Sequence, residues 1–277
     1  MSARQDVTEQ RARSDDRERI KWMEPMGSIP RSAYIAISIL SFVLLLCLWT
    51  LITGLGLVSP MFLPSPAAVL QTGIDLFVRF DFLADVWATV YRVFGGFLIA
   101  TVIAVPLGLL MGTFKPIEAF VEPMNSFLRY MPASAFIPLF ILWLGIGDVE
   151  KIAIIFVGCY FSMLLMIAVE VRSVQRELLE AAYTLGATPA QVLRRVILPA
   201  ALPGIYDILL LILGWGWTYI IVAELVAADQ GIGHMILQSQ RVLNTGNIIF
   251  GILFLGLIGL LTDTIFRMIG RRLFAWR

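Results

Sequence analysis

Histidine and cysteine are nearly missing from this 277-residue sequence, which has one histidine, His234, and two cysteines, Cys47 and Cys159. His234 lies in a polar loop, so the sequence argues against catalysis by a Ser-His-Asp triad. The cysteines lie in different apolar runs without ligand residues nearby, so we expect them to pack rather than to bind metal or form a disulfide. No glycine-rich phosphate loop of the Walker type occurs. These absences argue against an enzyme and against ATP binding by such a loop in this chain.

Charged residues are also scarce. They make up 15% of the chain, against about 25% in soluble domains, and 59% of the residues are hydrophobic. A helix needs about 20 apolar residues to cross a bilayer, and six stretches qualify, which predicts an all-α membrane protein with six spans. These stretches are residues 34–53, 87–112, 124–146, 151–170, 201–223 and 247–268. Arg129, Pro132 and Pro138 interrupt the third stretch, where we expect kinks.

The first 31 residues differ from the rest, because they hold seven Lys or Arg and six Asp or Glu. This segment is too long and too acidic for the start of a signal peptide, and no small-residue cleavage site follows the first apolar run. We therefore expect a retained cytoplasmic tail over residues 1–31 and a transmembrane domain over residues 32–277. The net charge of +1 does not indicate a nucleic-acid partner.

The distribution of Lys and Arg predicts the orientation in the membrane. With the N-terminus inside, the inner segments carry sixteen of these residues and the outer loops carry three, Arg79, Lys151 and Arg241. Because positive charge is retained inside, both termini and the loop at about 171–200 are predicted to be cytoplasmic. In the outer segments we expect a surface helix ending near Phe82 and, after Gly231-Ile-Gly233, a short helix ending near Leu243.

The loop at 171–200 has the signals of two short helices joined by a turn. Residues 174–185 carry an apolar stripe at helical spacing, made by Val174, Leu178, Leu179, Ala182 and Leu185. Gly186 suits the left-handed residue that ends a helix. Thr188-Pro189-Ala190-Gln191 has the form of a capping box with proline at the first helical position, so a second helix begins there. Pro199 and Pro203 are expected to break this second helix before the fifth span. A surface helix without a docking role is the plainer interpretation.

Glu180-Ala181-Ala182, Gly186 and Leu198-Pro199 with Pro203 form a motif of the order E-A-A-x-x-x-G followed by L-P-x-x-x-P. This motif resembles the EAA loop of the permease subunits of bacterial binding-protein-dependent ABC importers. The resemblance extends from about Phe62 onward and favours the nitrate, sulfonate, taurine and bicarbonate branch. The segments that carry it are Leu63-Pro64-Ser65-Pro66, Ala88-Thr89-Val90-Tyr91-Arg92-Val93, Pro106-Leu107-Gly108, Pro138-Leu139, Trp143-Leu144-Gly145 and Ala223-Glu224-Leu225.

The resemblance implies the type I ABC importer permease fold in the bacterial inner membrane. It implies a homodimer, two cytoplasmic ATPase subunits that bind ATP and magnesium, and an external substrate-binding protein. The first helix of the loop would be the coupling helix that inserts into the ATPase. Its coupling residues would be Glu180, Ala181, Ala182, Leu185, Gly186, Ala187 and Thr188. The chain itself would carry no cofactor and no catalytic residue.

Several charged and aromatic residues within the spans are candidates for the transport pathway. They are Arg92, Arg129, Asp207, Trp217 and Glu224. Ion pairs between helices, or side chains that extend to the headgroups, would explain the charges equally well. The branch that the chain resembles often carries an arginine where this chain has Leu210, which weakens the case for a small inorganic anion. We expect nitrate, a sulfonate or taurine as cargo and keep an aromatic carboxylate or a thiamine-precursor pyrimidine as alternatives. A secondary transporter driven by an ion gradient is the alternative of another class.

Overall fold

The computed structural model describes residues 29–226 and 228–275. The predicted tail, residues 1–31, therefore lies almost wholly outside the described part of the chain. The chain divides into two units, residues 1–66 and 67–277, and each is described by itself.

Over its described residues, 29–66, the first unit contains one long helix, α2 (Arg31–Gly54). Its 24 residues are mostly apolar, and none of its side chains is buried. At 1.5 Å per residue α2 is about 36 Å long, which is enough to cross the roughly 30 Å hydrocarbon core. Near its end, the indole nitrogen of Trp49 donates to the carbonyl of Pro64 at 3.0 Å and holds the following loop against the helix.

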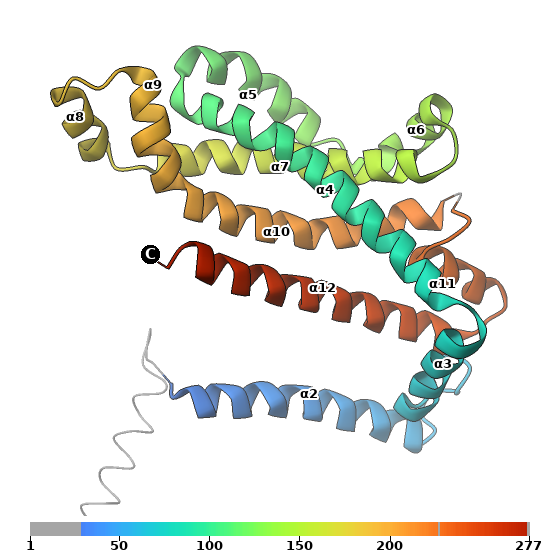
Figure 1. Ribbon diagram of the computed structural model, residues 1–277. Helices are drawn as coiled ribbons and strands as arrows, with labels where there is room; N and C mark the ends of the chain where they lie inside the picture. Colours follow the sequence, from blue (N-terminus) through green and yellow to red (C-terminus); the bar gives the residue numbers. More distant parts are fainter. Residues whose placement is uncertain (1–28, 227, 276–277) are drawn as a thin grey trace, which may run out of the picture. The chain divides into compact units, whose positions relative to one another are not determined.

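The second unit is a helical bundle, and its described residues contain no strand. Its elements are α3 (Pro66–Arg79), α4 (Phe82–Thr113), α5 (Lys115–Arg129), the 3-10 turn η1 (Ala133–Phe136), α6 (Ile137–Leu144), α7 (Asp148–Arg172), α8 (Arg176–Thr184), α9 (Pro189–Val192), the π-helical turn η2 (Leu193–Ile197), α10 (Leu198–Leu225), α11 (Ile232–Arg241) and α12 (Thr245–Leu273). Within this unit α4, α7, α10 and α12 run alongside one another (Figure 1). The short helices α8 and α9 lie at one end of these four, and α11 lies at the other.

Helices α4 and α7 pack closely because α4 carries a small residue at every fourth position. The series is Gly96, Ala100, Ala104, Gly108 and Gly112. A Cβ at Gly108 would lie 2.8 Å from Cγ2 of Ile167, and one at Gly112 would lie 2.6 Å from Cβ of Val171. Small residues on one face let helices in a membrane approach closely, where packing rather than hydrophobic exclusion drives association.

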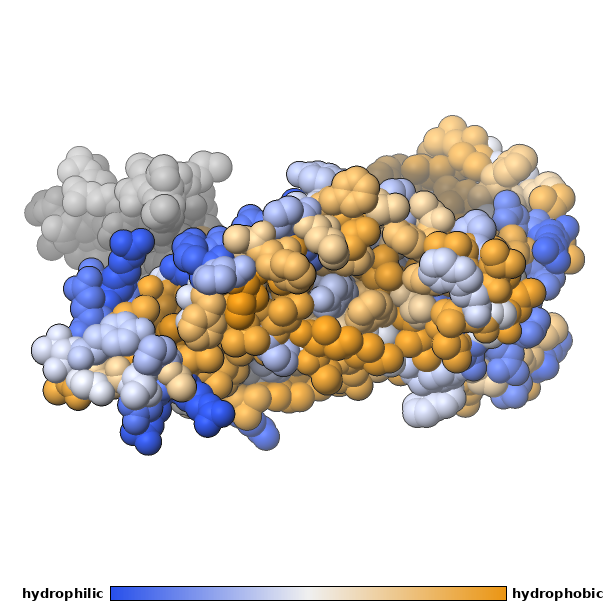
Figure 2. Space-filling model, turned by 90° about the horizontal axis from the view of Figure 1, so that it is seen from above, coloured by the Kyte–Doolittle hydropathy of each residue, from blue (hydrophilic) through white to orange (hydrophobic). Residues whose placement is uncertain are grey.

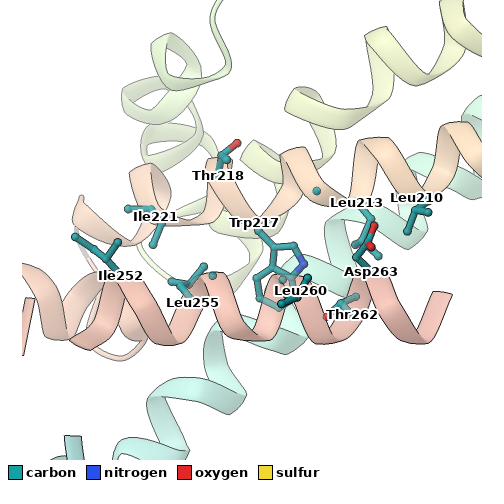
Figure 3. Close-up of a pocket in the computed structure, with 13 residues that line it drawn as sticks. Leu210, Leu213, Trp217, Thr218, Ile221, Ile252, Leu255, Leu260, Thr262 and Asp263 are labelled. Atoms are coloured by element: carbon teal, nitrogen blue, oxygen red, sulfur yellow. The ribbon is translucent and has the colours of Figure 1, made fainter. Parts of the chain in front are cut away.

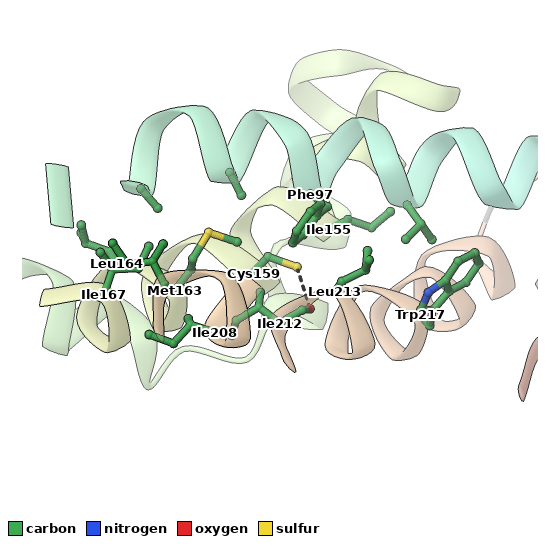
Figure 4. Packing of buried hydrophobic residues seen from close by; sticks show 14 of the residues in the cluster. Phe97, Ile155, Cys159, Met163, Leu164, Ile167, Ile208, Ile212, Leu213 and Trp217 are labelled. Atoms are coloured by element: carbon green, nitrogen blue, oxygen red, sulfur yellow. Dashed lines mark hydrogen bonds between the residues drawn. The ribbon is translucent and has the colours of Figure 1, made fainter. Parts of the chain in front are cut away.

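Helix α10 completes the core on the other side of α7. The buried side chains between these helices include Ile155, Met163 and Ile212, and Figure 4 shows them interleaved with Cys159. The thiol of Cys159 lies 3.8 Å from the carbonyl oxygen of Ile212 and donates to it. The cysteine therefore packs inside the core.

Among the described residues, five helices are long and apolar enough to cross a membrane, and a bent pair makes a possible sixth. The five are α2, α4, α7, the continuous helix from Pro189 to Leu225, and α12. Figure 2 shows apolar residues over the middle of the visible face and hydrophilic residues toward its two ends. This distribution suits a bilayer.

The expected third span at residues 124–146 is not one kinked helix. Helix α5 ends at Arg129, and the segment Ala133–Leu144 continues at 85° to it. Pro132 lies in the connection, and the residue before a proline is disfavoured in the helical conformation, which accounts for the break. Pro138 does not kink a helix either, because it lies in the first turn of α6, where its missing N–H costs nothing.

The predicted break at Pro199 and Pro203 is wrong. Residues 189–225 form one helix through the π-helical turn η2, and both prolines lie within it. Pro199 lies in the first turn of α10 directly after η2, where the hydrogen-bonding pattern already changes. The wider π turn leaves room for a ring that an α-helical interior would exclude.

Candidate functional site

The loop between α7 and α10 forms a projecting elbow of α8, a turn at Gly186, and α9 (Figure 1). Gly186 has a φ of +78°, in the left-handed region predicted for it. Its N–H donates to the carbonyl of Tyr183 at 2.9 Å, and the N–H of Ala187 donates to Ala182 at 3.0 Å. These bonds satisfy carbonyl groups at the end of α8, so the turn is fixed by local bonding.

The start of α9 is capped as the sequence predicts. The N–H of Gln191 donates to the Thr188 hydroxyl at 3.4 Å, and the N–H of Thr188 donates to the Gln191 side-chain oxygen at 2.8 Å. This reciprocal pair is a capping box, with Pro189 at the first helical position. Helices that are too short to be stable alone need such caps.

The apolar stripe on the first helix of the elbow is divided between two environments. Val174, Leu179 and Ala182 pack against the core, as expected. Leu178 is exposed, and Leu185 at the tip is 88% exposed, so only part of the predicted stripe packs against the bundle. Helix α8 ends at Thr184, so Leu185 is turned away from the bundle by the bend at Gly186.

The seven predicted coupling residues therefore lie together on the elbow. Glu180, Ala181, Leu185, Gly186 and Thr188 are exposed, and Ala182 and Ala187 are partly buried. A large apolar side chain surrounded by small residues and held on a rigid turn is a surface suited to binding a groove.

At the other end of the unit, Arg92 of α4 is the centre of a buried ion-pair network. Its Nη1 donates to Oε1 of Glu224 at 2.8 Å and to the carbonyl of Gln230 at 2.7 Å. Its Nε donates to Oδ1 of Asp148 at 2.7 Å. Arg92 is 5% exposed and Glu224 is fully buried. The arginine thus joins α4, α7, α10 and the loop before α11. We call Arg92, Asp148, Glu224 and Gln230 the Arg92 latch.

Glycines at 231 and 233 allow the loop to pass directly over Glu224. A Cβ at Gly233 would lie 2.7 Å from Cβ of Glu224, and one at Gly231 would overlap the Glu224 carboxylate. The N–H of Gly233 instead donates to Glu224 Oε2 at 2.9 Å. The first N–H groups of α11 are further satisfied by Thr89, whose hydroxyl accepts from Ile232, and by Asp85, which accepts from Gly231.

Two charged residues near the latch are buried although the sequence predicts no burial for them and places Lys151 in an outer loop. Glu150 is fully buried and Lys151 is 1% exposed, and their side chains pair at 3.1 Å. The ammonium group of Lys151 also donates to the carbonyl of Gly147 at 3.1 Å. Both residues come directly before an apolar run, where charged residues usually belong to the preceding loop. No local sequence pattern therefore marks them as buried.

Arg129 lies at the bend between α5 and α6, in a different environment from Arg92. It lines a cavity of about 260 Å³ bounded by the bend, α7 and α10. Its guanidinium carbon lies 4.9 Å from the centre of the Tyr130 ring. Its Nε is buried and has no hydrogen-bond partner among residues 29–226 and 228–275.

A second cavity, of about 490 Å³, lies between α10 and α12 and is mostly apolar (Figure 3). Trp217 stands in this space between the two helices, with Leu255 and Leu260 beside it and Asp263 toward one end. Asp207 lines an adjoining pocket with Arg267, and Leu210 borders both cavities. The leucine at position 210 therefore lies between them.

The predicted pathway residues do not form one site. Arg92 and Glu224 bind each other, Arg129 faces its own cavity, and Asp207 and Trp217 line the seam between α10 and α12. Whether any of them contacts cargo remains a prediction.

The sequence model of the binding-protein-dependent transport system inner membrane component matches residues 104–275. The taurine transport system permease protein of Escherichia coli is 34% identical over 263 residues, which cover 93% of this chain and 94% of the relative. The putative aliphatic sulfonates transport permease protein of Bacillus subtilis is 34% identical and covers 84% of each chain. The bicarbonate transport system permease protein of Synechococcus elongatus is 31% identical over 64% of each.

Among solved structures, inward-facing conformations of the MetNI methionine ABC transporter are similar in fold. One of these chains aligns with a TM-score of 0.57 at 24% identity, and the alignment covers 68% of this chain and 95% of that one.

Proposed function

The chain belongs to the family of binding-protein-dependent transport system inner membrane components, and we propose that it forms the translocation pathway of an ATP-driven importer of small anions. Members of this family are transport permeases rather than enzymes. In this proposal ATP and magnesium bind to a separate cytoplasmic ATPase, and an external binding protein delivers the cargo.

The observation that carries the proposal is the capped elbow at α8 and α9. Leu185 is almost fully exposed on a turn fixed by Gly186 and by the Thr188 capping box. A partner that covers Leu185 would remove its apolar surface from water, which favours binding at this place. We propose that the ATPase binds here and that Glu180 through Thr188 transmit its closure to α7 and α10, which the elbow joins directly.

Continuity of the helix supports this coupling. Helix α9 passes through η2 into α10 without a break, so a displacement of the elbow moves the 37-residue helix Pro189–Leu225 as one body. Helix α10 in turn carries Glu224 of the Arg92 latch at its far end. A displacement of the elbow is therefore transmitted to the Arg92 latch through this one helix.

The proposed cargo is a small compound with a negatively charged group, such as the zwitterion taurine, an alkylsulfonate or bicarbonate. Relatives that share about a third of their residues with this chain are named for these compounds. We further propose that two copies of the chain assemble around one pathway. Phe120, Met124 and Phe127 lie on one exposed face of α5 at helical spacing, and a second copy would cover them.

Reconstitution into liposomes tests the proposal. The chain is combined with its partner ATPase and binding protein, and uptake of labelled taurine, ethanesulfonate and bicarbonate is measured. We expect uptake that needs ATP, the ATPase and the binding protein together. Uptake by the chain alone along an ion gradient would show a secondary transporter instead and would refute the proposal.

A further inference from the structure

We propose that the cavity at the bend between α5 and α6 is an anion-binding site of the transport pathway, in which the guanidinium of Arg129 binds the charged group of a small sulfonate or carboxylate. This inference rests on the proposed function, because it assigns a step of transport to a site that neither the family match nor the relatives' names identify.

The first argument is the state of the Arg129 side chain. Its Nε lies buried at the cavity wall and has no hydrogen-bond partner among the described residues. Its guanidinium carbon lies over the Tyr130 ring, 4.9 Å from the ring centre, a distance typical of a cation–π contact. A planar fork of donors suits the oxygen atoms of a carboxylate or sulfonate.

The second argument is the contrast with Arg92. Arg92 has two carboxylates and a backbone carbonyl within 2.8 Å, so its charge is balanced within the protein. No ion pair of Arg129 is found among the described residues, although the residue lies at the bend of a helix pair that is, taken together, apolar enough to cross a membrane. An unpaired cation inside a membrane protein marks a site for an ion or substrate.

The third argument is that the cavity is held open by its surroundings. One turn before Arg129, the amide of the buried Asn125 donates to the carbonyl of Phe161 at 3.0 Å and fixes α5 against α7. On the opposite wall, Tyr219 lies flat against α7 because residue 158 is glycine. A Cβ there would come within 2.6 Å of the Tyr219 ring and push the ring aside.

The lining also matches the proposed class of ligand. Hydroxyl groups of Ser134, Ser162 and Tyr219 border the same space as the guanidinium. Ile154 and Val157 provide an apolar wall beside them. A volume of about 260 Å³ holds a small anion with a short carbon chain and a few water molecules, since one water occupies roughly 30 Å³.

Labelling of a cysteine in the cavity tests the charge of the site directly. Ser134→Cys is introduced into a Cys47→Ala background of the assembled transporter. The protein is then treated with sulfonatoethyl methanethiosulfonate, which is an anion, or with its trimethylammonium analogue, a cation. We expect the anionic reagent to be favoured, and Arg129→Gln to lower the ratio of the two rates by about tenfold or more.

Matched controls make this result specific. The ratio at Gln240→Cys, on α11, is expected to be the same with and without Arg129. Arg129→Lys keeps the charge and should keep most of the preference. A ratio at Ser134→Cys that does not change on Arg129→Gln overturns the proposal. Failure of both reagents to react with this cysteine, with or without ATP, overturns it too, because a transport site must open to water.

Uptake provides the second measurement. In liposomes that contain the ATPase and the binding protein, Arg129→Gln should lower uptake of taurine or ethanesulfonate about tenfold or more, and Arg129→Lys should recover part of it. Arg79→Gln, which changes an exposed arginine, should transport normally. If the wild-type protein shows no ATP-dependent uptake, the proposed function fails. If the wild-type protein transports and Arg129→Gln transports equally well, only the anion site fails.

Discussion

Arg92 and Arg129 are the same residue type in two helices of different character, the apolar α4 and the amphipathic α5, and their surroundings differ as well. From α4, Arg92 binds two other helices and a loop through short contacts, and its partner Glu224 is fully buried. Removing one member of a buried pair leaves the other charge without compensation, which typically costs about 3–5 kcal/mol. Removing both members costs far less.

A double-mutant cycle on Arg92 and Glu224 should show that removing one member of the pair destabilises the protein more than removing both. Arg92→Met is expected to lower the free energy of unfolding by about 3–5 kcal/mol, and Arg92→Met with Glu224→Gln by clearly less than the sum of the single changes. Thermal unfolding of the purified chain in detergent measures both. Additive effects would mean that the two side chains do not stabilise each other.

Residues of the latch show why a sequence alone does not reveal such a site. Arg92 and Glu224 are 132 positions apart, and Arg92 and Asp148 are 56 apart, so no local pattern connects them. The sequence does identify both as charges within spans. Gly231 and Gly233 also stand out as a pair, but their function, which is to let a backbone pass over a carboxylate, depends on the fold.

At the scale of the secondary-structure element, predictions succeed where the controlling interactions are local. The turn at Gly186 and the Thr188 capping box involve residues at most five apart, and both are present as predicted. The sequence predicts an interruption of the third span near Pro132, but as a kink and not as a bend of 85° between two helices. The continuity of the helix through Pro199 and Pro203 is not predicted, because it depends on a π turn that has no simple sequence signal. The four-residue spacing of small residues in α4 is visible in the sequence, and it marks the face of α4 that packs on α7.

The close packing of α4 and α7 leads to a prediction about Gly108. A Cβ at this position would lie 2.8 Å from Ile167 and 3.2 Å from the carbonyl oxygen of Leu164. Gly108→Val should therefore lower the free energy of unfolding by about 1–3 kcal/mol or more, because overpacking forces the helices apart. Gly214→Val is the control, since no described atom beyond its own helix backbone lies within 4 Å of a Cβ at that site. Equal thermal stability of the two variants would contradict this account of the packing.

The elbow leads to a prediction about Gly186. A Cβ at this position meets no described atom within 4 Å, so a substitution acts through the backbone and not through a clash. Valine at position 186 disfavours the positive φ, and adopting it costs about 1–2 kcal/mol. Gly186→Val should therefore distort the elbow and weaken ATPase binding. Gly186→Asn, which tolerates this conformation, should bind nearly normally. Co-purification of the ATPase with each variant measures the effect, and equal binding by the valine variant would remove the elbow from the proposed docking surface.

At the scale of the whole molecule, the position of the elbow relative to α11 determines how coupling can work. Helix α10 alone has 28 residues and is about 42 Å long, which exceeds the thickness of the hydrocarbon core. The elbow and α11 are at opposite ends of the four long helices of the second unit (Figure 1). They must therefore reach opposite sides of the membrane, and the excess of Lys and Arg predicts that the elbow side is cytoplasmic.

Labelling in intact cells tests this orientation. Ala190→Cys on α9 and Gln240→Cys on α11 are both exposed positions, and each is introduced without Cys47. A maleimide that cannot cross the inner membrane should label Gln240→Cys in spheroplasts and should label Ala190→Cys only after the membrane is opened. The reverse pattern would place the elbow outside, where ATP-driven closure of a cytoplasmic partner could not reach it. In that case the exposed Leu185 would have to bind an external protein, and coupling would have to enter the bundle from the α11 end.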